Sequence, residues 1–332
     1  MPEMSVIVVN WNGRHFLEVC LSALRRQTFR DFETILVDNG SNDGSVEYVK
    51  AHFPDVSLIA LGENTGFTGA NIAGYVQAKG ELIVLLNNDT EADPMWLEEI
   101  HKASSAYPEA GSFACKMLYF DERNRIENCG MDLGAGATVV DLGRDEIDGP
   151  EWAVSRKVFG GCGGAVAYRR HMLEDIGFLD PDFFIFFEDV DLSFRAQLRG
   201  HQCIFLPRAI VYHRYRATTK KGPAVFCSQR NIELVYLKNM PMGLIFRSLP
   251  QRLMYEVGAA IYFTKSGSGR AFLRGKLDVL RHLPSTLRKR KEIQSRKTVS
   301  SSELREIMRK PVFASKWKKF RAGWLAVPVK QS

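Results

Sequence analysis

Glu188, Asp189 and Asp191 form a dense cluster of carboxylates directly behind residues 183–187, which are all aromatic or apolar. An apolar segment directly before the acids places them at the edge of a hydrophobic core. There, desolvation and mutual repulsion raise the pKa of a carboxylate toward that of a useful base. A solvated first helical turn explains the same three residues equally well, because carboxylates favour that position. The segment is therefore either a general-base site or an ordinary helix start.

A fourth acid, Asp89, follows Asn87 and Asn88 at the end of an apolar run. Mg²⁺ and Mn²⁺ prefer hard oxygen ligands, and one or two carboxylates with phosphate oxygens and water suffice to bind them. The motif alone is weak, because an aspartate after a strand is often a helix cap. His213 stands alone after a strand-like segment, and a lone histidine is more often structural than a ligand.

The first hundred residues alternate short apolar runs with helical patterns, which predicts a doubly wound, open α/β sheet. We expect strands at Met4–Asn10, 33–38, 56–61 and 81–87, and helices at 15–27, 45–53 and 68–79. In such sheets the ligand lies beyond the carboxyl ends of the strands. The residues that follow each run are therefore site candidates by position, although Asn64, Gly66 and the segment from Asp38 to Ser41 are also ordinary turn residues.

The middle of the chain, residues 94–218, is less regular. We expect a helix at 94–107, a glycine-rich stretch at 160–164, a short helix at 170–176 and a helix that begins at Glu188 and ends at Gly200. Two strand-like segments at 203–206 and 210–212 lead to His213.

Composition indicates a globular protein with one large α/β domain and an appendage: of 332 residues, 45% are hydrophobic and 25% charged. The six cysteines show neither metal-ligand spacing nor a disulfide framework, which is typical of a reducing cytoplasm. The first residues run into a strand-like segment without a basic or long apolar stretch, so we expect no secretory signal and a cytoplasmic protein.

The charge is unevenly distributed along the chain. Residues 265–332 carry 19 lysines and arginines against four acids, whereas the first 264 residues carry 26 against 34. Residues 240–263 are apolar but too interrupted for a transmembrane span. Together with the basic clusters and Trp317, Phe320 and Trp324, they resemble a peripheral anchor on anionic lipid. A solvated helical bundle is the alternative, and RNA binding is disfavoured because no nucleic-acid module accompanies the charge.

Taken together, these segments resemble a family 2 glycosyltransferase of the GT-A fold, in particular its bacterial rhamnosyltransferase-like branch. The resemblance covers residues 4–238. Its motifs include Asn-Trp-Asn after the first strand, Asn64-Thr-Gly-Phe, Leu-Asn-Asn-Asp at the fourth strand and the glycine-rich loop from Gly160. The most specific of them is Phe-Phe-Ile-Phe-Phe-Glu-Asp-Val-Asp-Leu-Ser-Phe-Arg at 183–195, followed by Tyr212-His.

The resemblance implies a GT-A catalytic domain at 1–239, with a nucleotide-binding half at 1–93 and an acceptor half at 94–239, and a helical, basic, membrane-associating region at 240–332. It implies a divalent cation, Mg²⁺ or Mn²⁺, on Asp89 and His213. It also implies that Asp189 is the general base, with Glu188 beside it. Donor-binding positions would be Asn10, Trp11, Asn12, Asp38, Asn39, Asn64, Gly66, Asn88, Gly161, Gly163, Gly164 and Asp191. One departure is Asn87, which replaces the first carboxylate of the family's Asp-x-Asp metal motif and leaves the cation with fewer carboxylates.

The implied activity is inverting transfer of a sugar, rhamnose from dTDP-rhamnose by resemblance, to a hydroxyl of a glycan or polyprenyl-linked acceptor in cell-surface polysaccharide synthesis. The partners would be a dTDP- or UDP-sugar, that acceptor and an anionic membrane surface at the inner face of the cell membrane, with no nucleic acid. Two alternatives stay open, a nucleotidyltransferase with a similar half-fold and a non-catalytic polyanion-binding protein. A dehydrogenase is disfavoured because the first turn lacks GxGxxG.

Overall fold

The computed structural model describes residues 1–134, 136, 138–214 and 221–308. Its internal contacts divide it into two compact units. The first comprises residues 1–132 and 141–219, and the second comprises residues 133–140 and the chain from Lys220 onward. This grouping places helix α7 with the C-terminal helices, whereas the sequence-based boundary lies at 239/240. The predicted aromatic anchors Trp317, Phe320 and Trp324 lie outside the described residues.

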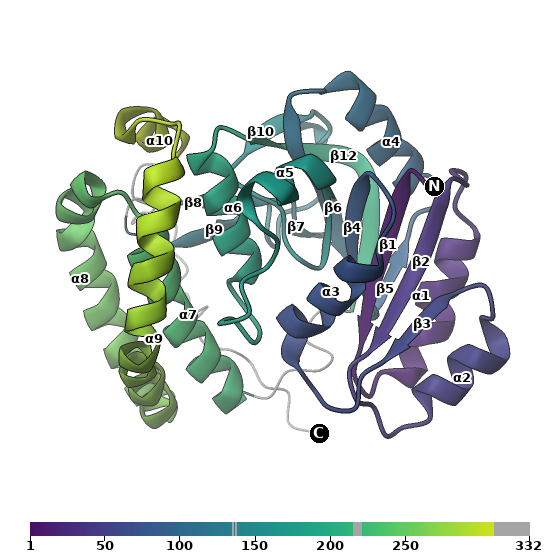
Figure 1. The fold of residues 1–332 in the computed structure, drawn as a ribbon, viewed down its shortest axis with the longest axis horizontal. Coiled ribbons are helices and arrows are strands. Elements are labelled where there is room, and N and C mark those ends of the chain that lie inside the picture. The colour runs from purple at the N-terminus through teal and green to yellow at the C-terminus, as the bar shows by residue number, and fades with distance from the viewer. Residues whose placement is uncertain (135, 137, 215–220, 309–332) are drawn as a thin grey trace. The chain divides into compact units, whose positions relative to one another are not determined.

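The first unit is built on one mixed sheet of ten strands (Figure 1). Along the main path the order is β10-β12-β6-β11-β4-β1-β2-β3, with β5 paired to β12 and β7 to β6. The strands are β1 (Met4–Asn10), β2 (Phe32–Asp38), β3 (Ser57–Ala60), β4 (Leu82–Asn87), β5 (Thr90–Ala92), β6 (Ala110–Tyr119), β7 (Ile126–Asn128), β10 (Arg156–Val158), β11 (Ala165–Arg169) and β12 (Gln202–His213). A separate two-stranded ribbon pairs β8 (Met131–Leu133) with β9 (Val139–Asp141).

Helices cover both faces of this sheet. They are α1 (Arg14–Arg25), α2 (Ser45–His52), α3 (Gly66–Gln77), α4 (Trp96–Ala106), α5 (Arg170–Ile176) and α6 (Glu188–Leu198), with a 3₁₀ turn at Pro150–Trp152. Alternate residues of β1 point to opposite faces: Val6 and Val8 pack with residues of α1, α2 and α4, whereas Ile7 packs with residues of α3, α5 and α6. Two apolar layers on one sheet confirm the predicted doubly wound architecture.

The first four strands run parallel, and their bounds differ from the predicted ones by one residue or none at each end. Two features of the middle region depart from the sequence-based prediction. The long strand β6 and the antiparallel strand β11 were not predicted. The segments at 203–206 and 210–212 were predicted as two strands but form the single strand β12, whose register against β6 shifts between Leu206 and Ile210. A bulge of this kind accommodates extra residues without ending the strand.

The second unit is helical. It contains α7 (Lys221–Asn239), α8 (Met242–Lys265), α9 (Gly269–Arg296) and α10 (Ser301–Ile307), together with the tip of the β8-β9 ribbon. Helix α10 begins with a capping box, in which Ser300 and Glu303 each accept a hydrogen bond from the other's main-chain amide. Among the described residues, no helix is long and apolar enough to cross a membrane.

Candidate active site

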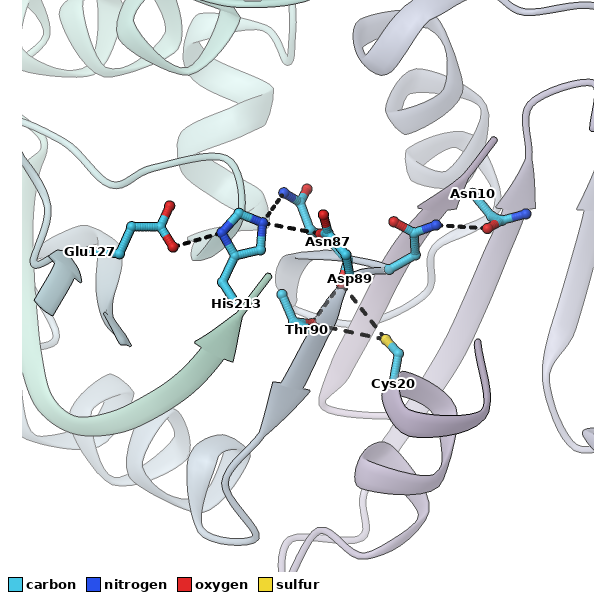
Figure 2. Close-up of polar contacts among 8 residues, drawn as sticks. Asn10, Cys20, Asn87, Asp89, Thr90, Glu127 and His213 are labelled. Atoms are coloured by element: carbon cyan, nitrogen blue, oxygen red, sulfur yellow. Dashed lines mark hydrogen bonds and ion pairs between the residues drawn. The ribbon is translucent and has the colours of Figure 1, made fainter. Parts of the chain in front are cut away.

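Asp89 and His213 face each other at the carboxyl end of β4 (Figure 2). Asp89 lies two residues after the end of β4. The next strand, β5, pairs antiparallel with the end of β12 so that Thr90 lies opposite His213. This pairing brings the Nε2 atom of His213 within 3.0 Å of Oδ1 of Asp89, although the two residues are 124 positions apart. The structure therefore brings together the two residues predicted to hold a cation.

Glu127, on β7, completes the arrangement from the other side of the imidazole ring. Its Oε2 atom lies 2.7 Å from Nδ1 of His213, and its side chain is buried. Burial opposes a charge on the imidazole, but the hydrogen bonds and charges of Asp89 and Glu127 outweigh that effect and raise the pKa of His213 to about 10. Without a metal, His213 is thus a buried imidazolium between two carboxylates.

The donor atoms at this site fit a cation that takes most of its ligands from a substrate. Asp89 contributes a carboxylate oxygen, and His213 an imidazole nitrogen at hydrogen-bond distance from it. In the part of the chain that the structure describes, no group of three or more His, Cys, Asp or Glu side chains is arranged to hold a metal ion. Such a cation would therefore depend on diphosphate oxygens and water for its remaining ligands, as Mg²⁺ commonly does. Binding to His213 would displace the proton that Nε2 carries toward Asp89.

A buried network of amides and one carboxylate lies beside Asp89 at the ends of β1, β2 and β4. The Nδ2 atom of Asn88 donates to Oδ1 of Asn10 at 2.7 Å, and Nδ2 of Asn10 donates to Asp38 at 3.0 Å. Asp38 also accepts a hydrogen bond from the main chain of Ser41 at 2.9 Å. Asn10 and Asp38 are almost completely buried, so much of their hydrogen-bonding capacity goes to fixing the strand ends and the loop after β2.

A second pair of amides fastens the loop after β3 to the end of β2. Asn39 donates to Oδ1 of Asn64 at 3.0 Å, and Asn64 in turn accepts from the main chain of Gly66 at 2.8 Å. Gly66 has a φ of +76°, and a Cβ there would lie 2.3 Å from the carbonyl oxygen of Phe184. Glycine is required at this position by both backbone conformation and space. The loop therefore packs directly against the aromatic run that precedes Asp189.

Trp11 and Asn12 form the turn after β1. Trp11 is 44% exposed, which leaves its indole accessible at the sheet edge. The main-chain amide of Asn12 donates to Oγ of Ser41 at 2.8 Å, and the side chain of Asn12 accepts from the amide of Asn42 at 2.9 Å. The turn is thus fixed against the loop after β2, with Trp11 as its exposed part.

Asp189 lies in the first turn of α6 and is only partly exposed. Its Oδ2 atom accepts a hydrogen bond from the main-chain amide of Gly163 at 2.8 Å. Burial raises the pKa of Asp189 to about 6, against the opposing effect of the amides of Gly163 and Val190. The neighbouring Glu188 is more deeply buried, its Oε2 atom has no hydrogen-bond partner, and burial with the adjacent charge raises its pKa well above the ordinary value. Of the two acids, Asp189 is the more exposed.

The turn before α6 is strained. Phe186 and Phe187 are both non-glycine residues with φ of +69°, in the left-handed region that costs about 1–3 kcal/mol for each such residue. The main-chain oxygen of Phe184, two residues earlier, accepts from the amide of Thr68 at 3.3 Å. This anchoring to the start of α3 stabilises a turn that presents Asp189 at the end of the aromatic run.

The glycine-rich loop at 160–164 connects the two acidic positions. Gly163 donates to Asp189, and the carbonyl oxygen of Gly164 accepts from the amide of Asn87 at 3.0 Å. A Cβ at Gly160, Gly161 or Gly164 would meet the protein's own side chains at 2.0 to 2.8 Å. These glycines let the loop pack tightly against α6, β11 and β6.

Asp191 lies in the first turn of α6, two residues after Asp189. Its side chain is fully buried and accepts a hydrogen bond from Nε of Arg195 at 2.9 Å, while Arg195 also donates to the carbonyl oxygens of residues 176–178. This ion pair ties α6 to the segment after α5. The structure thus places Asp191 in a buried ion pair with Arg195.

Glu127 was missed by the sequence analysis. It lies in the segment Arg125-Ile-Glu-Asn, which shows no motif and was treated as irregular. Its role depends on β7 pairing with β6 beside β12, and that pairing is a long-range feature. Ser41, which joins Asn10, Asn12 and Asp38, was noted only as a turn residue.

Residues 5–177, more than half of the chain, match the model of the family described as Glycosyl transferase family 2. The chain belongs to this family. It is an inverting family, and its members are glycosyltransferases. The two alternatives left open by the sequence, a nucleotidyltransferase and a non-catalytic binding protein, are therefore set aside.

Curated relatives of this glycosyltransferase are distant. An O-antigen biosynthesis protein RfbC of Myxococcus xanthus is 28% identical over 231 residues, which are 66% of this chain but only 18% of that protein. An N-acetylglucosaminyl-diphospho-decaprenol L-rhamnosyltransferase of Mycobacterium tuberculosis is 24% identical over 248 residues, 67% of this chain and 79% of the relative.

Solved structures show the same fold. A mannosyltransferase from Pyrobaculum calidifontis, solved with GDP-Man and Mn²⁺, superposes with a TM-score of 0.52 at 17% identity, covering 84% of this chain and 87% of that one. S. aureus TarS 1-349 with UDP-GlcNAc has a TM-score of 0.51 at 17% identity, covering 76% and 71%. At these identities the likeness concerns the fold, and it confirms the predicted GT-A architecture.

Proposed function

We propose that this family 2 glycosyltransferase uses Asp189 as the general base of a single-displacement reaction. An alcohol is a poor nucleophile at neutral pH, so a positioned carboxylate must take its proton as the new C–O bond forms. Asp189 combines partial exposure, a fixing hydrogen bond from Gly163 and a pKa of about 6, so that it is ionised at neutral pH yet basic enough to accept a proton. This combination is the observation that carries the proposal. Displacement at the face opposite the leaving group inverts the anomeric centre.

We infer that the donor diphosphate binds beside Asp89 and His213 with a divalent cation, Mg²⁺ or Mn²⁺. When bound, the cation would neutralise the negative charge that develops on the leaving nucleoside diphosphate. Asp89 and His213 hold it on the protein side, and Glu127 keeps the imidazole oriented toward Asp89. The exposed Trp11 and the loops fixed by Asn10, Asp38 and Asn64 would contact the nucleotide. Support comes from the superposing mannosyltransferase, which holds GDP-Man and Mn²⁺.

For the substrates, we propose rhamnose from dTDP-rhamnose as donor and a polyprenyl-linked glycan as acceptor. The support is the mycobacterial relative, which its name describes as a rhamnosyltransferase acting on a diphospho-decaprenol, and the relative from O-antigen biosynthesis. An acceptor on a lipid would place the reaction at the cytoplasmic face of a cell membrane, in the synthesis of a surface polysaccharide.

Two measurements test this function in sequence. First, thermal unfolding is followed with UDP, dTDP or GDP, with and without Mn²⁺ or Mg²⁺. We expect dTDP or UDP with a cation to raise the Tm, and Asp89→Asn to lose the part of the shift that requires the cation. Second, hydrolysis of the donor is measured across a panel of nucleotide sugars. Faster hydrolysis of a nucleotide sugar other than dTDP-rhamnose would overturn the proposed choice of donor. If none of the nucleotides raised the Tm, the proposed donor-binding site would be overturned.

A further inference from the structure

Helix α8 has an inverted distribution of polarity. Most of its exposed side chains are apolar, and Phe246 at 70% and Val257 at 60% are the most exposed of them. The exposed polar side chains are those of Arg247, Thr264 and Lys265. The apolar ones recur at spacings of three and four residues, so they lie along one side of the helix. The members of this row are Met242, Phe246, Leu249, Leu253, Val257 and Ile261. A row of this size on a surface helix marks an interaction site, because scattered single apolar residues are normal but contiguous ones are not.

Two charged residues in the middle of α8, Arg252 and Glu256, point toward the neighbouring helices. Arg252 is buried and forms ion pairs with Glu256 at 2.9 Å and with Glu233 of α7. Lys276 of α9 pairs with Glu233 and, at 2.7 Å, with Glu256. This network joins α7, α8 and α9. Rotating α8 to bury the apolar row would break these ion pairs and leave their partners unpaired, so the network holds the row outward.

Helix α9 carries a second exposed apolar row and a row of arginines next to it. Leu273, Leu277, Leu280 and Leu287 are all more than half exposed. At about 100° per residue, the arginines fall on the neighbouring strip of the helix surface. They are Arg270, Arg274, Arg281 and Arg288. Leucines bordered by arginines are typical of a helix that lies in the interface of an anionic membrane.

A recess of about 510 Å³ adjoins both apolar rows. It is lined by Met242, the first residue of the α8 row, and Leu287, the last of the α9 row. The rest of its lining includes three cationic side chains, Arg290, Lys291 and Lys297. Apolar and cationic groups around one recess match an amphiphile with an anionic head.

We propose that the two rows on α8 and α9, the apolar face, rest on the surface of a bilayer containing anionic lipid, with a phosphate-bearing headgroup in the recess. The charge of this face favours an anionic bilayer over a second copy of the chain. A second copy of this chain docked through the same face would bring the arginine row of α9 close to an identical row, whereas anionic headgroups complement it. This inference rests on the proposed function only in that a lipid-linked acceptor gives the contact a use.

The test is flotation of the full chain with vesicles, without donor or acceptor, so that its outcome is independent of the proposed chemistry. We expect the wild type to float with phosphatidylcholine vesicles containing phosphatidylglycerol and to bind pure phosphatidylcholine at least tenfold less. The double variant Phe246→Asp/Leu253→Asp should lose at least tenfold in binding. Val154→Asp, at an equally exposed apolar residue of the first unit, should bind like the wild type. Circular dichroism and thermal unfolding verify that each variant is folded.

The recess has its own pair of variants. Lys291→Ala/Lys297→Ala should weaken binding to the anionic vesicles by several fold, whereas Lys50→Ala/Lys157→Ala, which removes the same charge elsewhere, should weaken it far less. Equal losses for both pairs would overturn the recess as a headgroup site. The membrane face itself is overturned if the wild type stays unbound, or if folded Phe246→Asp/Leu253→Asp floats as well as the wild type. A wild-type dimer that this double variant converts to a monomer, without vesicle binding, would assign the face to a second copy.

Discussion

The main-chain amide of Gly163 donates a hydrogen bond of 2.8 Å to Oδ2 of Asp189. The next residue, Gly164, accepts a hydrogen bond from the amide of Asn87, two positions before Asp89. The glycine-rich loop therefore links the first turn of α6 with the end of β4. Both candidate acids are positioned by the same short segment, which supports placing acceptor and donor chemistry in one site.

Asp189→Asn should remove the base while keeping the shape of the side chain. We expect turnover to fall by about 10²- to 10⁴-fold, the usual contribution of general-base catalysis. Donor binding, followed by thermal shift with nucleotide and cation, should change little, because Asp189 is not among the residues proposed to hold the nucleotide. Turnover near the wild-type level would exclude Asp189 as the base.

The pH dependence of the reaction should follow the same carboxylate. Burial raises the pKa of Asp189 to about 6, and only the ionised form can accept a proton. We therefore expect kcat/KM to fall as the pH decreases through about 6, by up to tenfold per pH unit below it. The residual activity of Asp189→Asn should not show this fall in kcat/KM at low pH. A wild-type profile that stays flat down to pH 5 would contradict the assignment.

Glu127→Gln tests whether the buried carboxylate orients His213. Loss of a partner that fixes a metal-binding histidine typically weakens metal affinity by about 10- to 100-fold. We expect a loss in that range when Mn²⁺ is titrated into the protein with nucleoside diphosphate present and free Mn²⁺ is measured by electron paramagnetic resonance. Glu122→Gln, an exposed acid a few residues earlier, is the matched control. Equal affinities for the two variants would show that Glu127 plays no part in cation binding.

Asp191→Asn separates a structural role from a role in donor binding. Removing one partner of a buried ion pair leaves the other charge uncompensated, at a cost of about 3–5 kcal/mol in the free energy of unfolding. We expect chemical denaturation to show a loss of that order, because Asp191 and Arg195 are both buried. Asp55→Asn, which breaks the exposed pair with Arg25, should cost at most about 1 kcal/mol. If Asp191→Asn kept its stability but lost donor binding, Asp191 would be assigned a role in donor binding instead.

The sequence by itself determined the parallel half of the sheet and the segment that carries the candidate base. The strands β1 to β4 are continuous apolar runs bounded by turn residues, so local composition is enough to locate them. Glu188 and Asp189 were likewise found at the predicted helix start, because an aromatic run followed by clustered acids is a local pattern.

Only the tertiary structure decided which distant residues meet. The insertion of β11 between β4 and β6, and the pairing of β5 with β12, bring His213 to Asp89, and Glu127 reaches the same imidazole through β7. Asp191, which the sequence could not distinguish from its neighbours, is turned inward to Arg195. The physical reason is that hydrogen bonding and burial depend on the packing of segments far apart in the chain, and residue types in one segment do not specify their partners in another.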